Sequence, residues 1–201
     1  MSASTPERSG TQAPPSNWNI ANALTTLRLV LVPVFGWLLL MGDGQDTSVR
    51  LWALAVFLLA AITDRFDGDL ARRWGLVTDF GKIVDPIADK ALMGMAFVGL
   101  SMLGELWWWV TAVVLFRELG ITLMRFWVIR HGVMAASRGG KLKTVLQVVA
   151  LSLYICPLPE ELLILAHLTM AAAVVVTLAT GVDYIVKAIA LRREGMRAPA
   201  K

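Results

Sequence analysis

The sequence predicts an all-α integral membrane protein with six transmembrane helices and both termini in the cytoplasm. Its composition is the first observation behind this prediction. Of 201 residues, 57% are hydrophobic and 17% are charged, whereas about a quarter of the residues of a soluble domain are charged. Mean hydropathy is +0.64. Cys156 is the only cysteine, which excludes an intrachain disulfide.

The second observation is a series of six apolar segments, each close to the ~20 residues that cross a bilayer. They lie at about 21–41, 49–66, 83–103, 106–129, 142–158 and 162–190. The second and fifth segments are short, so we expect their helices to continue outside the membrane. Together the segments predict a multi-pass protein of the cell membrane.

The third observation is the charge of the loops, which alternates along the chain. One set of loops is acidic and carries Asp43, Asp46, Glu105, Glu160 and Glu161, with Arg50 as its one basic residue. The other loops and the tails carry Arg8, Arg65, Arg72, Arg73, Lys82, Arg130, Arg138, Lys141, Lys143, Arg192, Arg193, Arg197 and Lys201. The positive-inside rule places this basic side in the cytoplasm. The net charge of +4 therefore indicates topology and not nucleic acid binding.

The chain divides into one membrane domain and two tails. Residues 1–18 are rich in Ser, Thr, Pro and Gly, a composition typical of a disordered segment. Residues 19–193 contain all six apolar segments, and 194–201 form a short basic tail. Both tails are expected in the cytoplasm.

Four aspartates mark the cytoplasmic ends of the second and third spans. Asp64 and Asp67 are three residues apart, and Asp85 and Asp89 are four apart. On a helix, both spacings place the two side chains on one face. Because the linker between the spans is short, the two helix ends must be neighbours. We therefore expect the four carboxylates to converge at one depth of the membrane interface.

Converging carboxylates repel one another unless a cation offsets their charge. Carboxylate oxygens suit Mg²⁺ or Mn²⁺, and four of them could hold two ions. The alternative is that the acids are solvated and paired with nearby basic residues. We adopt that alternative for Asp69 and Asp79 only.

Residues beside the aspartates favour a phosphate ligand. Gly68 and Ala71 are small enough for a ligand to approach the helix backbone. Arg72 follows Asp64 by eight residues, lies on roughly the same helical face and could pair with a phosphate. Metal ions, an arginine and a bare helix surface together predict a diphosphate ligand at the membrane surface.

The pattern Asp64-x-x-Asp67-Gly68-x-x-Ala71-Arg72, followed by Gly81, Asp85 and Asp89, resembles the signature of the CDP-alcohol phosphotransferase family. The resemblance covers eight positions over 26 residues. It implies a six-span fold, a homodimer, and transfer of a substituted phosphate from a CDP-linked donor to an alcohol with release of CMP. Residues 19–193 would then be the catalytic domain.

The resemblance also implies residue roles. Asp89 resembles the general base of the family as well as a metal ligand, and it would share a two-metal site with Asp64, Asp67 and Asp85. Other positions resemble residues that bind the cytidine nucleotide: Asn22, Thr25, Gly68, Ala71, Arg72 and Thr78.

A second polar set indicates an acceptor pocket. Arg117, Glu118 and Arg125 lie in an apolar segment, where a charge costs ~2.5–3.5 kcal/mol and usually faces the interior of the bundle. Lys141 and Lys143 begin the next helix, whose N-terminus itself favours an anion. These residues predict a pocket for a phosphorylated alcohol. The lysines could instead be topological anchors, and Glu118 could pair with an arginine.

Three segments, "NxxTxxR", "RELGITLMR" and "GGKLKT", resemble the phosphatidylglycerophosphate synthase branch of the same family. That resemblance implies CDP-diacylglycerol as donor, sn-glycerol 3-phosphate as acceptor, and phosphatidylglycerol phosphate as product. It adds Arg28 to the residues expected to bind the acceptor phosphate.

Two other functions stay open. The same chemistry could use inositol phosphate or phosphatidylglycerol as the acceptor, as in a phosphatidylinositol phosphate synthase or a cardiolipin synthase. A divalent-cation transporter is disfavoured because the acids cluster at one interface and no other span continues a path. Asp183 and Lys187 are interpreted as a structural ion pair that faces the bundle.

Overall fold

A computed structural model describes residues 20–74, 79–128 and 138–197, in which all regular structure is helical. For these residues the side chains are described as well, except at 20–21, 64–83, 85, 125–139 and 191–197. The elements in chain order are α1 (Ile20–Leu40), the 3₁₀ helix η1 (Met41–Gly44), α2 (Thr47–Trp74), α3 (Asp79–Met102), α4 (Trp108–Val128), α5 (Arg138–Ile155), the 3₁₀ helix η2 (Glu160–Leu162) and α6 (Leu163–Arg197).

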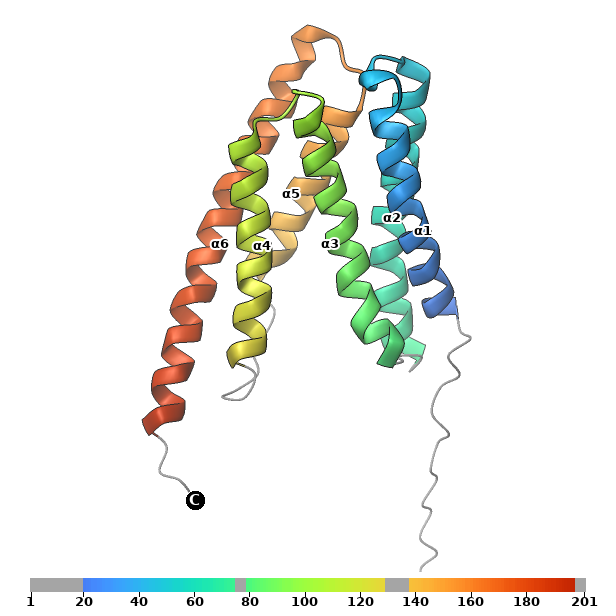
Figure 1. Ribbon diagram of the computed structural model, residues 1–201. Helices are drawn as coiled ribbons and strands as arrows, with labels where there is room; N and C mark the ends of the chain where they lie inside the picture. The colour runs from blue at the N-terminus through green and yellow to red at the C-terminus, as the bar shows by residue number, and fades with distance from the viewer. Residues whose placement is uncertain (1–19, 75–78, 129–137, 198–201) are drawn as a thin grey trace, which may run out of the picture.

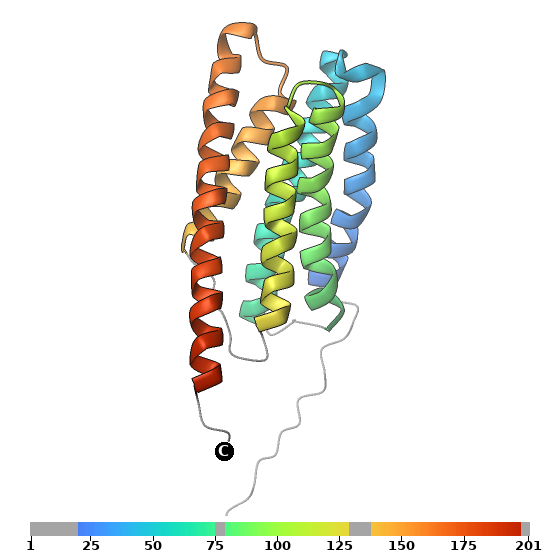
Figure 2. The same ribbon diagram turned by 60° about the vertical axis from the view of Figure 1, so that its left-hand side comes forward.

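The helices run up and down along the bundle, and successive helices are antiparallel (Figures 1 and 2). One end holds the start of α1 and the end of α6; we call it the terminal end. The opposite end holds η1, η2 and the α3–α4 connection. The alternation of helix direction agrees with the alternation predicted from loop charge.

Two helices are longer than the apolar segments predicted to form them. Helix α2 continues beyond residue 66 to Trp74, and α5 begins at Arg138, before residue 142. Both observations confirm that the short apolar segments belong to longer helices. Helix α6 has 35 residues, about 52 Å at a rise of 1.5 Å per residue, and it projects past its neighbours at the terminal end (Figure 2).

The core forms where α1 packs against α2 and α3. Phe35 of α1 and Phe57 of α2 are fully buried, with ring centroids 5.4 Å apart. At Gly99 of α3, a Cβ atom would lie 2.6 Å from Cδ2 of Leu39, so only glycine allows α1 to approach this closely. Other buried members of this core are Phe97, Leu92, Leu100, Leu151 and Ile155.

The outer surface is strongly apolar on every helix. Phe116 is 77% exposed, and exposed tryptophans include Trp37 and Trp52. A continuous apolar surface of this kind is unfavourable in water and suited to lipid. Among the described residues, Asn22–Gly44 and Glu160–Ala190 are long and apolar enough to cross a membrane, with mean hydropathies of 2.0 and 2.4; Thr47–Thr63 is a shorter apolar helix.

A buried arginine joins the elements at the end away from the termini. Arg50 of α2 donates from Nε to the Ile155 carbonyl at 3.0 Å and from Nη2 to the Tyr154 carbonyl at 2.6 Å. Nη1 donates to the Gly44 carbonyl at 3.3 Å. The guanidinium also makes a bidentate pair with Glu105, with Nη2 at 2.8 Å from Oε2 and Nη1 bound to Oε1. All five donors of the guanidinium are thus used.

The sequence interpretation of Asp183 and Lys187 is half correct. Their ion pair is present, with Nζ 2.6 Å from Oδ2. It does not face the bundle, because 45% of the Asp183 side chain and 54% of the Lys187 side chain are exposed. The inner face of α6 is taken by Thr177, Thr180, Gly181, Tyr184 and Ala188, which are buried. Positions 183 and 187 therefore fall on the other side of the helix.

Candidate active site

The two aspartate pairs lie on neighbouring helix ends. Asp64 and Asp67 are in the last turns of α2, and Asp85 and Asp89 are in the first turns of α3, all near the terminal end. Four residues connect the helices, which limits the gap between them to about 18 Å of extended chain. The backbone of each pair lies within one continuous helix.

Only part of the predicted donor site falls among the described side chains. Asp89 does, whereas Asp64, Asp67, Gly68, Ala71, Arg72, Thr78 and Asp85 lie outside them. The described side chains contain no group of three or more His, Cys, Asp or Glu that could hold a metal. The donor set itself, carboxylates spaced on two adjacent helix ends, fits the oxygen ligands that Mg²⁺ prefers. The metal site stays a prediction.

The three residues predicted on α1 face the interior together. Asn22, Thr25 and Arg28 recur at every third position and are 6%, 1% and 0% exposed. They share the side of α1 that packs against α2 and α3. A fully buried guanidinium requires compensating acceptors or anions. Their common burial is what a polar pocket lined by α1 requires.

A small cavity with a few polar side chains in a mainly apolar lining lies between α3, α4 and α5, and we call it the Asp89 cavity. Its volume is about 120 Å³. Asp89 reaches it from α3, Glu118 from α4 and Lys143 from α5. Its other lining residues are Lys90, Met93, Gly94, Phe97, Val114, Leu115, Leu119, Thr144 and Gln147. The structure thus brings the predicted base and one predicted acceptor residue to the same cavity.

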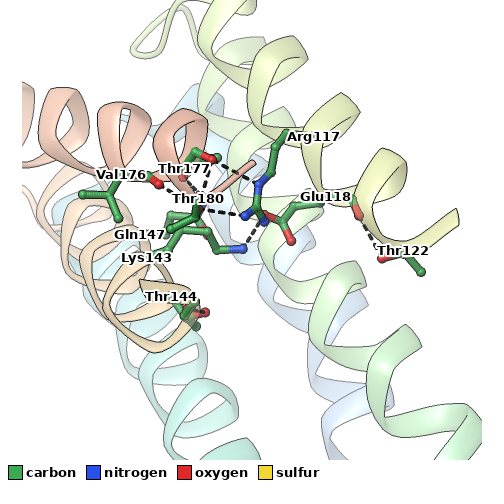
Figure 3. A network of polar contacts seen from close by, with 10 residues as sticks. Arg117, Glu118, Thr122, Lys143, Thr144, Gln147, Val176, Thr177 and Thr180 are labelled. Carbon is green, nitrogen blue, oxygen red and sulfur yellow. Dashed lines mark hydrogen bonds and ion pairs between the residues drawn. The ribbon is translucent and has the colours of Figure 1, made fainter. Parts of the chain in front are cut away.

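Figure 3 shows how the charges around this cavity are joined. Oε1 of Glu118 accepts a hydrogen bond from Nζ of Lys143 and lies 3.1 Å from Nη1 of Arg117. The Lys143 side chain is 9% exposed and the Arg117 side chain 10%. One carboxylate oxygen therefore offsets two largely buried cations.

Arg117 is bound to α6 and is not among the residues that line the Asp89 cavity. Its Nε donates to the Thr177 carbonyl at 3.1 Å, and Nη2 donates to Oγ1 of Thr180 at 2.8 Å (Figure 3). Its guanidinium carbon lies 5.9 Å from the centre of the Tyr184 ring. A Cβ atom at Gly181 would lie 3.3 Å from Cγ of Arg117, so the glycine gives the arginine room.

The remaining acceptor candidates are spread more widely. Lys141 is exposed at the start of α5, Arg28 is buried on α1, and the Arg125 side chain lies outside the described part. Sequence reasoning gave no site role to Glu118 or Gln147, although both line the cavity. Nε2 of Gln147 donates to Oγ1 of Thr177 at 3.1 Å. The signal for both was a polar residue inside an apolar segment.

Comparison with known proteins agrees with this arrangement. The family model described as CDP-alcohol phosphatidyltransferase matches residues 18–179, a range that includes every predicted site residue. The chain belongs to this family. The resemblance found in the aspartate signature is thereby confirmed, and the protein is a transferase.

Curated relatives carry more specific names. A protein of Mycobacterium tuberculosis (strain H37Rv), named "Probable phosphatidylglycerophosphate synthase", is 56% identical over 171 residues, covering 85% of this chain and 82% of the relative. Two relatives are named CDP-diacylglycerol–glycerol-3-phosphate 3-phosphatidyltransferase. That of Bacillus subtilis (strain 168) is 34% identical, covering 85% of this chain and 95% of its own. That of Escherichia coli (strain K12) is 40% identical, covering 67% and 75%.

Proposed function

We propose that the protein transfers the phosphatidyl group of CDP-diacylglycerol to sn-glycerol 3-phosphate, giving phosphatidylglycerol phosphate and CMP. The names of the three relatives support this choice of substrates. The observation that carries the proposal is the Asp89 cavity, where a carboxylate and a buried ammonium lie within one small space. A phosphorylated alcohol needs both, one group for its hydroxyl and one for its phosphate.

The donor is proposed to bind across α1, α2 and α3. Asn22, Thr25, Gly68, Ala71, Arg72 and Thr78 would hold the CDP moiety. Asp64, Asp67, Asp85 and Asp89 would hold two Mg²⁺ ions, with Mn²⁺ as an alternative. Such ions would neutralise charge on the diphosphate. The inward-facing residues of α1 support a nucleotide pocket at this place.

The acceptor is proposed to bind with its phosphate at Lys143 and its terminal hydroxyl at Asp89. The hydroxyl oxygen forms a bond to the phosphatidyl phosphorus, and the bond from that phosphorus to the CMP oxygen breaks. CMP leaves with the electron pair, and the hydroxyl proton passes to the Asp89 carboxylate. A carboxylate is a sufficient base here, since in a loose transition state the proton leaves late.

The membrane arrangement is part of the proposal. Six helices would span the cell membrane, with both tails and the active site on the cytoplasmic side and the protein as a homodimer. The up-and-down bundle, its apolar surface and the basic sequence at the terminal end support the spans and their orientation.

An acceptor panel tests the function. Purified protein in detergent receives Mg²⁺ and CDP-diacylglycerol with sn-glycerol 3-phosphate, inositol phosphate or phosphatidylglycerol, and released CMP is measured. We expect CMP with glycerol 3-phosphate only, because the cavity is small and holds a lysine for the phosphate. CMP with inositol phosphate or phosphatidylglycerol, and none with glycerol 3-phosphate, would overturn the acceptor assignment.

A further inference from the structure

We propose that Glu118 recognises the hydroxyl group of the acceptor that does not react, and that it thereby selects acceptors that carry one. The inference rests on the proposed function, because it concerns an acceptor bound in the Asp89 cavity. It assigns a specificity role to a residue that the aspartate signature does not include.

The two oxygens of the Glu118 carboxylate have different surroundings. Oε1 is occupied by Lys143 and Arg117. Among the residues that the structure describes, no side chain or backbone group makes a hydrogen bond to Oε2. Glu118 also lines the cavity. One oxygen therefore fixes the carboxylate, and the other is available to a ligand.

The orientation of Glu118 is fixed from outside the cavity. Arg117 bonds to Thr177 and Thr180 of α6, so the cation that holds Oε1 is itself anchored (Figure 3). Lys143 and Arg117 both lie at one oxygen of the Glu118 carboxylate. An ionised carboxylate only accepts hydrogen bonds, and a hydroxyl donates to it strongly.

The charges of the cavity orient the acceptor. Lys143 attracts a phosphate, whereas Glu118 repels one. Glycerol 3-phosphate has a phosphate, a terminal hydroxyl and a middle hydroxyl, and the cavity offers Lys143, Asp89 and Glu118. The middle hydroxyl is the group left for Oε2 of Glu118. A carboxylate beside a phosphate site would weaken anion binding unless it recognised such a group.

The cavity volume agrees with a ligand of this size. One ordered water needs about 10–15 Å³ of such space, so 120 Å³ leaves room for a small ligand. Glycerol phosphate is of this size, and a cyclic polyol phosphate is larger.

The test compares two acceptors that differ only at the middle hydroxyl. 3-Hydroxypropyl phosphate keeps the phosphate and the reacting hydroxyl of glycerol 3-phosphate and lacks the middle one. The kcat/KM of CMP release is measured for both acceptors with the wild-type protein and with Glu118→Gln. We expect the wild type to prefer glycerol 3-phosphate by about 100-fold or more, because a site built for a hydroxyl rejects an analogue without it. In Glu118→Gln the preference falls to about tenfold or less.

The ratio is measured on one preparation, so any unfolded fraction cancels. Glu105→Gln is the matched control, since Glu105 is also held by an arginine but lies at the other end of the bundle; its preference should equal that of the wild type. A wild type without preference, an unchanged preference in Glu118→Gln, or equal loss of both acceptors would overturn the role of Glu118 alone. No turnover of glycerol 3-phosphate by the wild type would overturn the proposed function as well.

Discussion

Two buried ion pairs in the described part of the protein differ in their surroundings. Arg50 and Glu105 satisfy each other and the surrounding carbonyl groups, and they leave nothing for a ligand. Arg50 and Glu105 also line a hollow, of about 400 Å³, but the donors of Arg50 are all used within the protein. Lys143 and Glu118 border the Asp89 cavity, and one oxygen of the Glu118 carboxylate accepts no hydrogen bond from the described residues. Buried ion pairs add little net stability over an apolar packing. A pair that borders a cavity with a polar atom left over therefore needs a functional explanation, which the proposed acceptor site provides.

Lys143 should act on the acceptor and not on the donor. In Lys143→Gln the ammonium that meets the acceptor phosphate is lost, together with a charged hydrogen bond worth about 1.5–3 kcal/mol. We expect the KM for glycerol 3-phosphate to rise about 10- to 100-fold while the KM for CDP-diacylglycerol stays within about twofold. Steady-state CMP release measures both.

The control for this variant is Lys187→Gln, which removes an exposed lysine of α6 and should change neither constant. An equal rise of both KM values in Lys143→Gln would show that Lys143 does not belong to an acceptor pocket.

Single residues differ in how far the sequence could predict them. Asp89 and Lys143 follow from spacing and from polar residues in apolar segments, whereas the polar residues of α1 were expected only from the family resemblance. The direction in which the Arg117 side chain points cannot be predicted in this way, because its partners on α6 are 60 and 63 residues away in the sequence. Once α6 holds Arg117, the carboxylate beside it turns to the cavity. No local pattern contains that contact.

At the scale of helices, the apolar runs predict that a helix is present better than they predict where it ends. Helices α2 and α6 continue past their apolar runs to Trp74 and Arg197, because a helix stops only where its backbone groups are capped or broken and not where hydropathy changes. The orientation of a helix about its own axis was harder to predict. The pair at Asp183 is correct in spacing, but α6 turns another face inward.

The Arg50 network should stabilise the contacts between elements. The ammonium group of a lysine has three donors and lacks the planar, five-donor arrangement of a guanidinium. Arg50→Lys therefore leaves carbonyl groups of α5 and one Glu105 oxygen poorly bonded. We expect a loss of about 2–4 kcal/mol in the free energy of unfolding. For a chain of this length that lowers Tm by about 5–15 °C, as thermal unfolding in detergent would measure.

Asp183→Asn is the control for Arg50→Lys, because it breaks an exposed ion pair worth less than about 1 kcal/mol. A Tm of Arg50→Lys as close to the wild type as that of the control would show that the network is dispensable.

For the whole molecule, loop charge predicts the order of up and down helices, and the bundle follows it. It does not predict which helices touch. The Asp89 cavity exists because α3, α4 and α5 meet around it, and its fixed charge exists because α4 packs on α6. These contacts join segments far apart in the chain, so no local sequence pattern contains them.

The central claim is that Asp89 receives the acceptor proton in this cavity, and Asp89→Asn tests it most directly. CMP release with Mg²⁺, CDP-diacylglycerol and glycerol 3-phosphate should fall by at least about 10³-fold, since the amide is not a base, while binding of CDP-diacylglycerol is largely retained. Asp43→Asn, an exposed change at the opposite end, should keep full activity. Turnover of Asp89→Asn within about tenfold of the wild type would contradict the account.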